Sequence, residues 1–196
     1  METEFYRIIT AISQFLEGLF FGFCIITLLA LIVYIFYKKN ELQTFIKYSV
    51  LVAKNLAIFY FVIYTISLSI YYSSKEFEIF SERATGPYAW AYWMKLLRPI
   101  VFCGLLQLFW IKKMVSKMRY VALIIFFALI MLLCSGAILE KFIIITTSYH
   151  RDYLPSDYSF NSNIILSLIL YVFKFGILFN ALVFISWVIR KEPKFK

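Results

Sequence analysis

The stretch from Phe15 to Tyr37 reads FLEGLFFGFCIITLLALIVYIFY, and its only charged side chain is that of Glu17. A helix rises about 1.5 Å per residue, so roughly 20 predominantly apolar residues cross a bilayer hydrocarbon core of about 30 Å. Irregular backbone exposed to lipid would leave polar groups unpaired, whereas a helix pairs them internally. The stretch therefore predicts a membrane-spanning helix.

Four more apolar stretches follow along the 196-residue chain, with ends that pattern alone places only to within a few residues. The composition agrees with a membrane protein, because 63% of the residues are hydrophobic and 21% are aromatic. We predict an all-α integral membrane protein, with one domain over residues 1–196 and five transmembrane helices. The other four spans run from about Ser49 to Tyr72, Trp90 to Ile111, Tyr120 to Ile145, and from the helix-start signal Asn161-Ser162-Asn163 to near Ile189.

The segment that leads into the first span, from Phe5 onward, is amphipathic. It either lies in the membrane interface or prolongs the spanning helix. The first span has no basic leader and no small-residue cleavage site, so we expect it to remain in the mature chain.

The distribution of Lys and Arg predicts the orientation, because short cytoplasmic loops are enriched in cations. We expect the N-terminus outside and the C-terminus in the cytoplasm, with the basic face attracting anionic lipid. No nucleic-acid-binding pattern accompanies the formal net charge of +9. One side collects eleven cations, namely Lys38, Lys39, Lys47, Lys112, Lys113, Lys117, Arg119, Arg190, Lys191, Lys194 and Lys196.

The supply of metal ligands excludes some cofactors. His150 is the only histidine, so a haem ligated by two histidines of this chain is impossible, although a haem shared with another subunit is compatible. Cys24, Cys103 and Cys134 stand singly in different spans without the spacing of a zinc site, and we interpret them as packing residues. We expect no haem or metal held by this chain alone.

Charged and polar groups at membrane depth are costly in lipid, so they are candidates for function. Glu17 lies near the outer boundary, Lys95 and Arg98 lie in the outer third of the third span, and Gln107 lies deeper on that span. Arg98 precedes Pro99, which cannot donate a backbone hydrogen bond, and a kink there would free carbonyls beside the guanidinium. Two alternatives stay open: a structural ion pair of Glu17 with Lys95 or Arg98, and a ligand site.

Two lysines lie farther along the spans. Lys54 is close enough to the inner boundary for its ammonium to snorkel. Lys174 is near the middle of the fifth span, and we predict no carboxylate of this chain at its depth. A carboxylate of a partner chain, a lipid phosphate or snorkelling would each stabilise it.

The predicted outer loop Ser148–Tyr158 contains His150-Arg151-Asp152, which combines a titratable ring, a fixed cation and a carboxylate. This loop and two further segments resemble the polysulfide-reductase/NrfD-type membrane subunits, and most closely the quinol-oxidising subunits of alternative complex III. The other two segments are Thr85-Gly86-Pro87-Tyr88 with Ala91-Tyr92-Trp93, and Gln107-Leu108-Phe109-Trp110 with Lys112-Lys113.

The resemblance implies a location in a bacterial inner membrane, a quinone bound near the outer face and electrons passed to haem or iron–sulfur subunits docked there. Glu17 or Asp152 would then accept protons, His150 would hydrogen-bond a quinone carbonyl or relay a proton, and Arg98 with Lys95 would stabilise negative charge. Gln107 is a further candidate for binding quinone. We place the predicted site between the first, third and fourth spans.

Family members have more than five spans, arranged as two bundles. The resemblance therefore makes this chain a shortened relative with one bundle, a subunit that pairs with another chain, or a diverged member without quinone. Two other functions are weighed against a quinol-oxidising subunit. One is a non-catalytic structural or adaptor subunit of a transport, secretion or assembly complex, which suits Lys174 better. The other is a pore or transporter that works alone, which the absence of an internal repeat disfavours.

Overall fold

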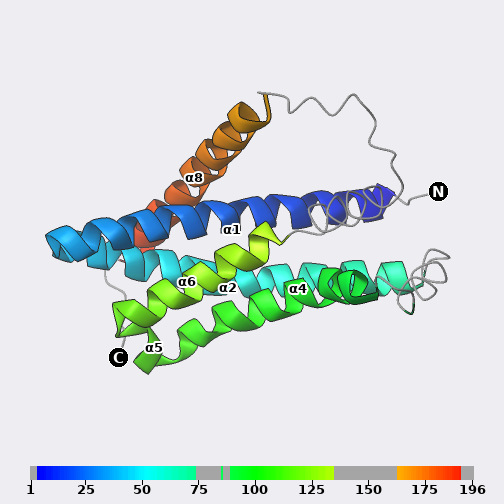
Figure 1. Ribbon diagram of the computed structural model, residues 1–196, viewed down its shortest axis with the longest axis horizontal. Helices are drawn as coiled ribbons and strands as arrows, with labels where there is room; N and C mark the ends of the chain where they lie inside the picture. Colours follow the sequence, from blue (N-terminus) through cyan, green and yellow to red (C-terminus); the bar gives the residue numbers. More distant parts are fainter. Residues whose placement is uncertain (1–3, 74–84, 86–88, 135–162, 191–196) are drawn as a thin grey trace, which may run out of the picture.

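The computed structural model describes residues 4–73, 85, 89–134 and 163–190, and every regular element in these ranges is a helix (Figure 1). The predicted all-α class is confirmed for this part of the chain. The elements are α1 (Glu4–Tyr37), α2 (Asn40–Tyr72), α4 (Ala89–Gln107), the 3-10 helix η1 (Leu108–Trp110), α5 (Lys112–Val115), α6 (Met118–Leu133) and α8 (Asn163–Arg190).

Helices α1 and α2 form a long antiparallel hairpin (Figure 1). Because α1 is continuous from Glu4, the amphipathic lead-in prolongs the first helix. Lys38 ends α1 with a left-handed backbone conformation, φ 47°, and its N–H donates to the carbonyl of Tyr34 over 2.8 Å. Lys39 is extended and α2 starts at the next residue.

Four helical segments within the described residues are long and apolar enough to cross a membrane: α1, α2, Tyr92–Trp110 and Ile169–Ile189. They correspond to the predicted first, second, third and fifth spans. Helix α6 is apolar but 16 residues long, and the rest of the predicted span from Tyr120 to Ile145 lies outside the described residues.

Aromatic rings fill the space between the helices. Phe20 of α1 stands edge-on to Tyr60 of α2 and Phe102 of α4, with ring centroids 5.6 and 5.0 Å apart. Three residues farther along α1, Phe23 packs against Phe109 of η1 and Phe179 of α8, with ring centroids 6.5 and 5.4 Å apart. All six residues are at most 2% exposed, so α1 is the element around which the other helices gather.

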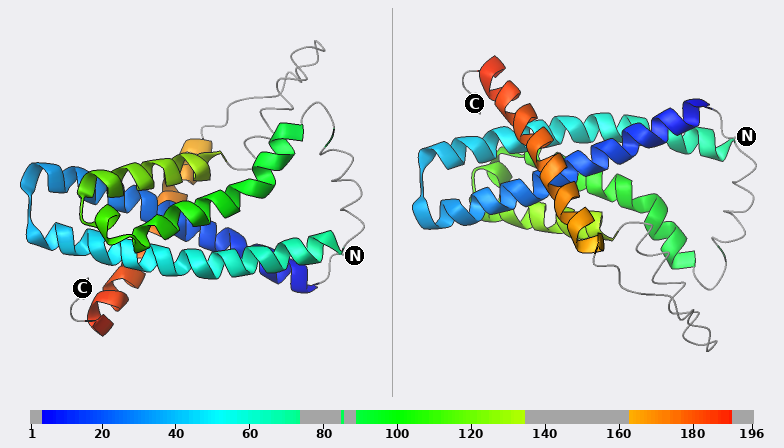
Figure 2. Two further views of the ribbon diagram at one scale, coloured as in Figure 1. Left: turned by 90° about the horizontal axis from the view of Figure 1, so that it is seen from below. Right: turned by 90° about the horizontal axis from the view of Figure 1, so that it is seen from above.

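Helix α8 crosses α1 obliquely, instead of running parallel to the rest of the bundle (Figures 1 and 2). Two glycines of α1, Gly18 and Gly22, allow the close approach. A Cβ on Gly18 would clash with the ring of Phe175, and a Cβ on Gly22 would lie 2.5 Å from the backbone carbonyl oxygen of Phe175. Small residues spaced by four commonly form such contacts between membrane helices.

Helix α4 contains Pro99 and changes direction along its length (Figure 2). The N–H that Pro99 lacks would have bonded the carbonyl of Lys95, one turn earlier. At the next position, the carbonyl of Leu96 accepts a hydrogen bond of 2.6 Å from the hydroxyl of Tyr64 in α2. The predicted kink therefore coincides with a polar contact between α4 and α2.

Candidate functional site

Glu17 joins three helices. Its Oε1 atom accepts hydrogen bonds from Nη2 of Arg98 over 2.6 Å and from the hydroxyl of Tyr60 over 2.7 Å. The carboxylate thus links α1 to α2 and α4. Of the two alternatives that the sequence left open, an ion pair of Glu17 with Arg98 is present. It does not exclude a ligand site, because both hydrogen bonds use one oxygen of the carboxylate.

This pair is unequally buried. The side chain of Arg98 is 12% exposed and that of Glu17 is 30% exposed. The second nitrogen of the guanidinium, Nη1, is buried and has no hydrogen-bond partner among the described residues. In a low-dielectric setting the Glu17 charge is therefore what compensates Arg98, and Glu17 itself reaches the surface of the bundle.

The exposed side of Glu17 opens into a groove of about 470 Å³ between α1 and α8, which we call the α1–α8 groove. Its polar side chains are those of Gln14, Glu17, Tyr171 and Lys174. Aromatic rings form much of the rest of the wall: the rings of Tyr171 and Phe175 have centroids 4.6 Å apart, and Phe15 stands 5.8 Å from Phe175. The groove is lined by Ala11, Gln14, Phe15, Glu17, Tyr171, Lys174 and Phe175.

Lys174 is exposed on α8, and its ammonium lies 5.5 Å from the centre of the Phe175 ring. It lines the same groove as Glu17, a carboxylate that counting residues along the predicted spans did not place near it. The physical reason is the oblique crossing of α8 over α1: residues counted along a tilted helix do not map onto depth in a parallel bundle (Figure 2).

Gln107 lies apart from the α1–α8 groove, at the end of α4. Its amide nitrogen donates to the carbonyl of Lys54 over 3.3 Å, and its amide oxygen accepts from the indole of Trp110 over 2.6 Å. Lys54 is 7% exposed, and its ammonium lies 3.8 Å from the centre of the Trp110 ring. The structure thus places Gln107 and Lys54 together, away from Glu17 and Arg98.

The other candidate residues lie where side chains are not described. His150 and Asp152 are outside the described residues, as is the loop that carries them. Lys95 lies on α4, but its side chain is outside the described part. The predicted contributions of these three residues therefore stay predictions. Among the described residues, no group of His, Cys, Asp and Glu forms a metal site.

Several residues of the site were missed by reading the sequence. Tyr60, Gln14 and Tyr171 are ordinary residues for a membrane helix, and nothing in their local sequence points to Glu17. One signal was readable: Gly18-Leu19-Phe20-Phe21-Gly22 is a small-residue motif that predicts a helix contact next to Glu17. The groove lies between the first and fifth predicted spans, whereas the sequence placed the site between the first, third and fourth.

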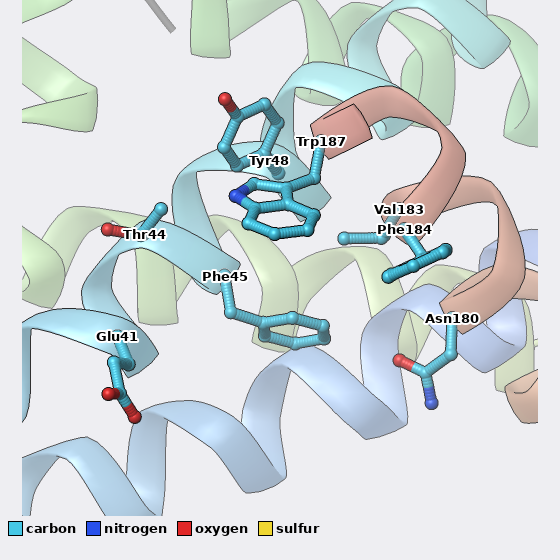
Figure 3. A pocket seen from close by; sticks show the side chains of 8 residues that line it. All are labelled: Glu41, Thr44, Phe45, Tyr48, Asn180, Val183, Phe184 and Trp187. Atoms are coloured by element: carbon cyan, nitrogen blue, oxygen red, sulfur yellow. The ribbon is translucent and has the colours of Figure 1, made fainter. Parts of the chain in front are cut away.

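A second groove, of about 400 Å³, lies between the start of α2 and the end of α8 (Figure 3). Trp187 and Phe45 stand on its two sides, with Asn180 at one end and Glu41 at the other (Figure 3). The Tyr48 hydroxyl points away from the space between these side chains (Figure 3). This groove lacks paired opposite charges, so the α1–α8 groove is the stronger candidate site.

Comparison of the chain with protein-family models, with curated proteins and with solved structures finds no match. The α1–α8 groove and the contacts of Glu17 therefore carry the functional argument.

Proposed function

We propose that the chain is a five-span subunit of a respiratory-type complex in a bacterial inner membrane, and that the α1–α8 groove binds quinol. The observation that carries the proposal is that the carboxylate Glu17 and the cation Lys174 both line one groove that is open to the bundle surface. Quinol dissolves in the bilayer, and its headgroup can enter such a groove from the lipid. The resemblance to NrfD-type subunits is part of this proposal.

The groove supplies the groups that quinol oxidation needs. Glu17 has a carboxylate oxygen, Oε2, that neither Arg98 nor Tyr60 uses, and it is placed to accept a proton from a quinol hydroxyl. Lys174, Tyr171 and Gln14 are hydrogen-bond donors for the other oxygen of the ring. Phe15 and Phe175 offer apolar surface to the ring itself.

The electrons leave through another subunit. Oxidation of one quinol releases two electrons and two protons, and we propose that a haem- or iron–sulfur-bearing partner accepts the electrons near the outer face. The loop with His150 and Asp152 and the residue Lys95 complete the proposed site, as a proton relay and a cation beside the headgroup. Gln107 belongs to a separate contact with Lys54 and Trp110, so we leave it out of the quinol site.

The proposal is tested on the complex purified in mild detergent with its native partners. A quinone that carries a photoreactive tail should label peptides of α1 and α8, and excess unlabelled quinol should suppress the labelling. The extracted lipid should contain quinone, and partner subunits should show haem or iron–sulfur absorption.

A matched pair of variants locates the site. Lys174→Met should reduce labelling, whereas Lys113→Met, a change of an exposed lysine outside the groove, should not. Labelling confined to other helices, or a complex without quinone, would contradict the proposal.

The second candidate function is a non-catalytic adaptor subunit. The specific observation in its favour is that Lys174 lies exposed on α8, among apolar side chains that are exposed as well, including Leu170, Phe173 and Ile177. A partner helix that brings a carboxylate to Lys174 would stabilise this surface. Crosslinks from position 173 to another protein chain, without any bound quinone, would support the adaptor function instead.

A further inference from the structure

The outer part of α1 carries hydroxyl groups on the face that leads to Glu17. Thr10 and Ser13 precede Glu17 by seven and four residues, and this spacing places the three side chains on one side of a helix. The distance from Glu17 to Thr10 along the helix axis is about 10 Å at about 1.5 Å per residue. The row therefore runs from the α1–α8 groove toward the start of α1.

The hydroxyls are connected by contacts. The hydroxyl of Tyr60 donates to Oε1 of Glu17 over 2.7 Å, and the side chain of Ser13 lies beside the Tyr60 hydroxyl. The hydroxyl of Thr10 is buried and has no hydrogen-bond partner among the described residues. Residues three apart on a helix have Cβ atoms about 5–6 Å apart, a gap that two rotating hydroxyls or one water molecule bridge.

On the other side of Glu17 the same face of α1 is apolar. Phe20 and Cys24 follow Glu17 by three and seven residues, and both are fully buried. Phe20 packs against Tyr60 and Phe102, which fills the space beyond the carboxylate. A proton on Glu17 therefore meets hydroxyls toward the start of α1 and hydrocarbon toward its end.

We propose that Tyr60, Ser13 and Thr10 form a proton path between Glu17 and the outer end of α1. The proposal rests on the proposed function, since it assigns an exit to the protons of quinol oxidation. In this proposal, Ser13 and Thr10 relay protons from quinol oxidation and do not contact quinol themselves.

The transfer conserves protons and electrons. One quinol becomes one quinone, its two electrons pass to the haem or iron–sulfur partner, and its two protons go to Glu17 one after the other. With Glu17 ionised, Tyr60 donates toward it. Once Glu17 holds a proton it becomes the donor, the hydroxyls rotate, and the proton passes through Tyr60, Ser13 and Thr10 to the outer solution.

The experiment compares two hydroxyl deletions with a matched control in the complex with its native partners, reconstituted into vesicles. Thr10→Val and Ser13→Ala remove hydroxyls of the path. Thr27→Val removes a buried hydroxyl of the same helix that also lacks a partner among the described residues, but it lies beyond Glu17 in the apolar direction. Bound quinol, the rate of quinol oxidation and its change in D₂O are measured for each.

We expect Thr10→Val and Ser13→Ala to bind quinol like the parent and to oxidise it about 10²-fold more slowly, the lower end of what proton-transfer groups contribute. Their rates should fall further in D₂O, because proton transfer limits them. Thr27→Val should keep the parental rate, and so should Ser13→Thr, which retains a hydroxyl.

Each other outcome overturns the path. If both hydroxyl deletions bind quinol and oxidise it at the parental rate, the proton path is contradicted and the proposed quinol site is not. An equal loss in Thr27→Val, or a loss in Ser13→Thr as large as in Ser13→Ala, would show a general effect of changing α1. A parental complex that neither binds nor oxidises quinol would overturn the proposed function and the path together.

Discussion

Glu17 contacts the interior of the bundle and also lines the α1–α8 groove. One oxygen of its carboxylate pairs with Arg98 and Tyr60 inside the bundle, and the same side chain lines the α1–α8 groove. A buried guanidinium that loses its only counter-charge is more costly than the loss of both charges together. The structural and the proposed chemical contributions of Glu17 therefore have to be separated by paired substitutions.

We expect Glu17→Ala to destabilise the protein by about 3–5 kcal/mol, because it leaves Arg98 buried without a counter-charge. The double variant Glu17→Ala/Arg98→Leu should be more stable than Glu17→Ala alone. Unfolding by SDS titration in mild detergent measures the free energies of the four proteins in the cycle. Additive losses would show that the two side chains do not interact.

In the proposed quinol site, the charge of Lys174 binds quinol. The side chain of Lys174 is exposed and does not pack in the bundle core. A hydrogen bond to a charged group contributes about 1.5–3 kcal/mol, so Lys174→Met should weaken quinol binding by roughly 10- to 100-fold. Isothermal titration of the purified complex with a soluble quinol analogue measures the Kd. The unfolding free energy should stay close to parental, since the side chain is exposed.

At the scale of the element, the α1–α8 groove depends on how closely two helices approach. Gly22 allows the contact, because a Cβ there would lie 2.5 Å from the carbonyl oxygen of Phe175, and backbone cannot move aside as a side chain can. Gly104 of α4 offers a matched control, since a Cβ there would meet nothing within 4 Å.

We expect Gly22→Ala to separate α8 from α1 and to lose the groove, whereas Gly104→Ala should be neutral or slightly stabilising. Gln14 and Tyr171 line the groove from α1 and α8. The yield of a disulfide crosslink between cysteines introduced at these two positions measures how closely α1 and α8 approach. Equal crosslinking yields in the two glycine variants would contradict the assigned α1–α8 contact.

At the scale of the molecule, the distribution of charge predicts the orientation. One end of the bundle collects the turn between α1 and α2 together with α5, and its lysines include Lys38, Lys39, Lys112 and Lys113 (Figure 1). Cationic loops stay in the cytoplasm. In intact cells, an impermeant thiol reagent should label Gly86→Cys and not Lys113→Cys. The reverse pattern would invert the topology.

The predicted outer loop provides a test of the proposed function on the whole complex. His150→Ala and Asp152→Asn should slow quinol oxidation by about 10²–10⁴-fold, the usual contribution of general acid–base groups, while subunit composition stays intact. Assembly is measured by size-exclusion chromatography alongside activity. Normal assembly with the parental rate would remove both residues from the site.

Much of the fold could be predicted from the sequence, because it depends on local properties. Long apolar runs determine where the helices form, and the structure has a helix in all five predicted places, although α6 is short within the described residues. The contact of Glu17 with Arg98 was one of two predicted options, since few charges are present at that depth. A charged side chain in a low-dielectric setting is stabilised by an opposite charge, and this requirement limits the side chains that can pair with Glu17.

The sequence by itself determined the all-helical class, the positions of the long apolar helices and the residues for which lipid would be a costly environment. Only the tertiary structure decided which of them meet: Tyr60 and Arg98 on Glu17, and Lys174 across the groove from it. The reason is that an apolar run specifies a helix but neither its rotation nor its tilt. Those follow from packing between distant residues, such as Gly22 against the backbone of Phe175, which lets α8 cross α1 obliquely.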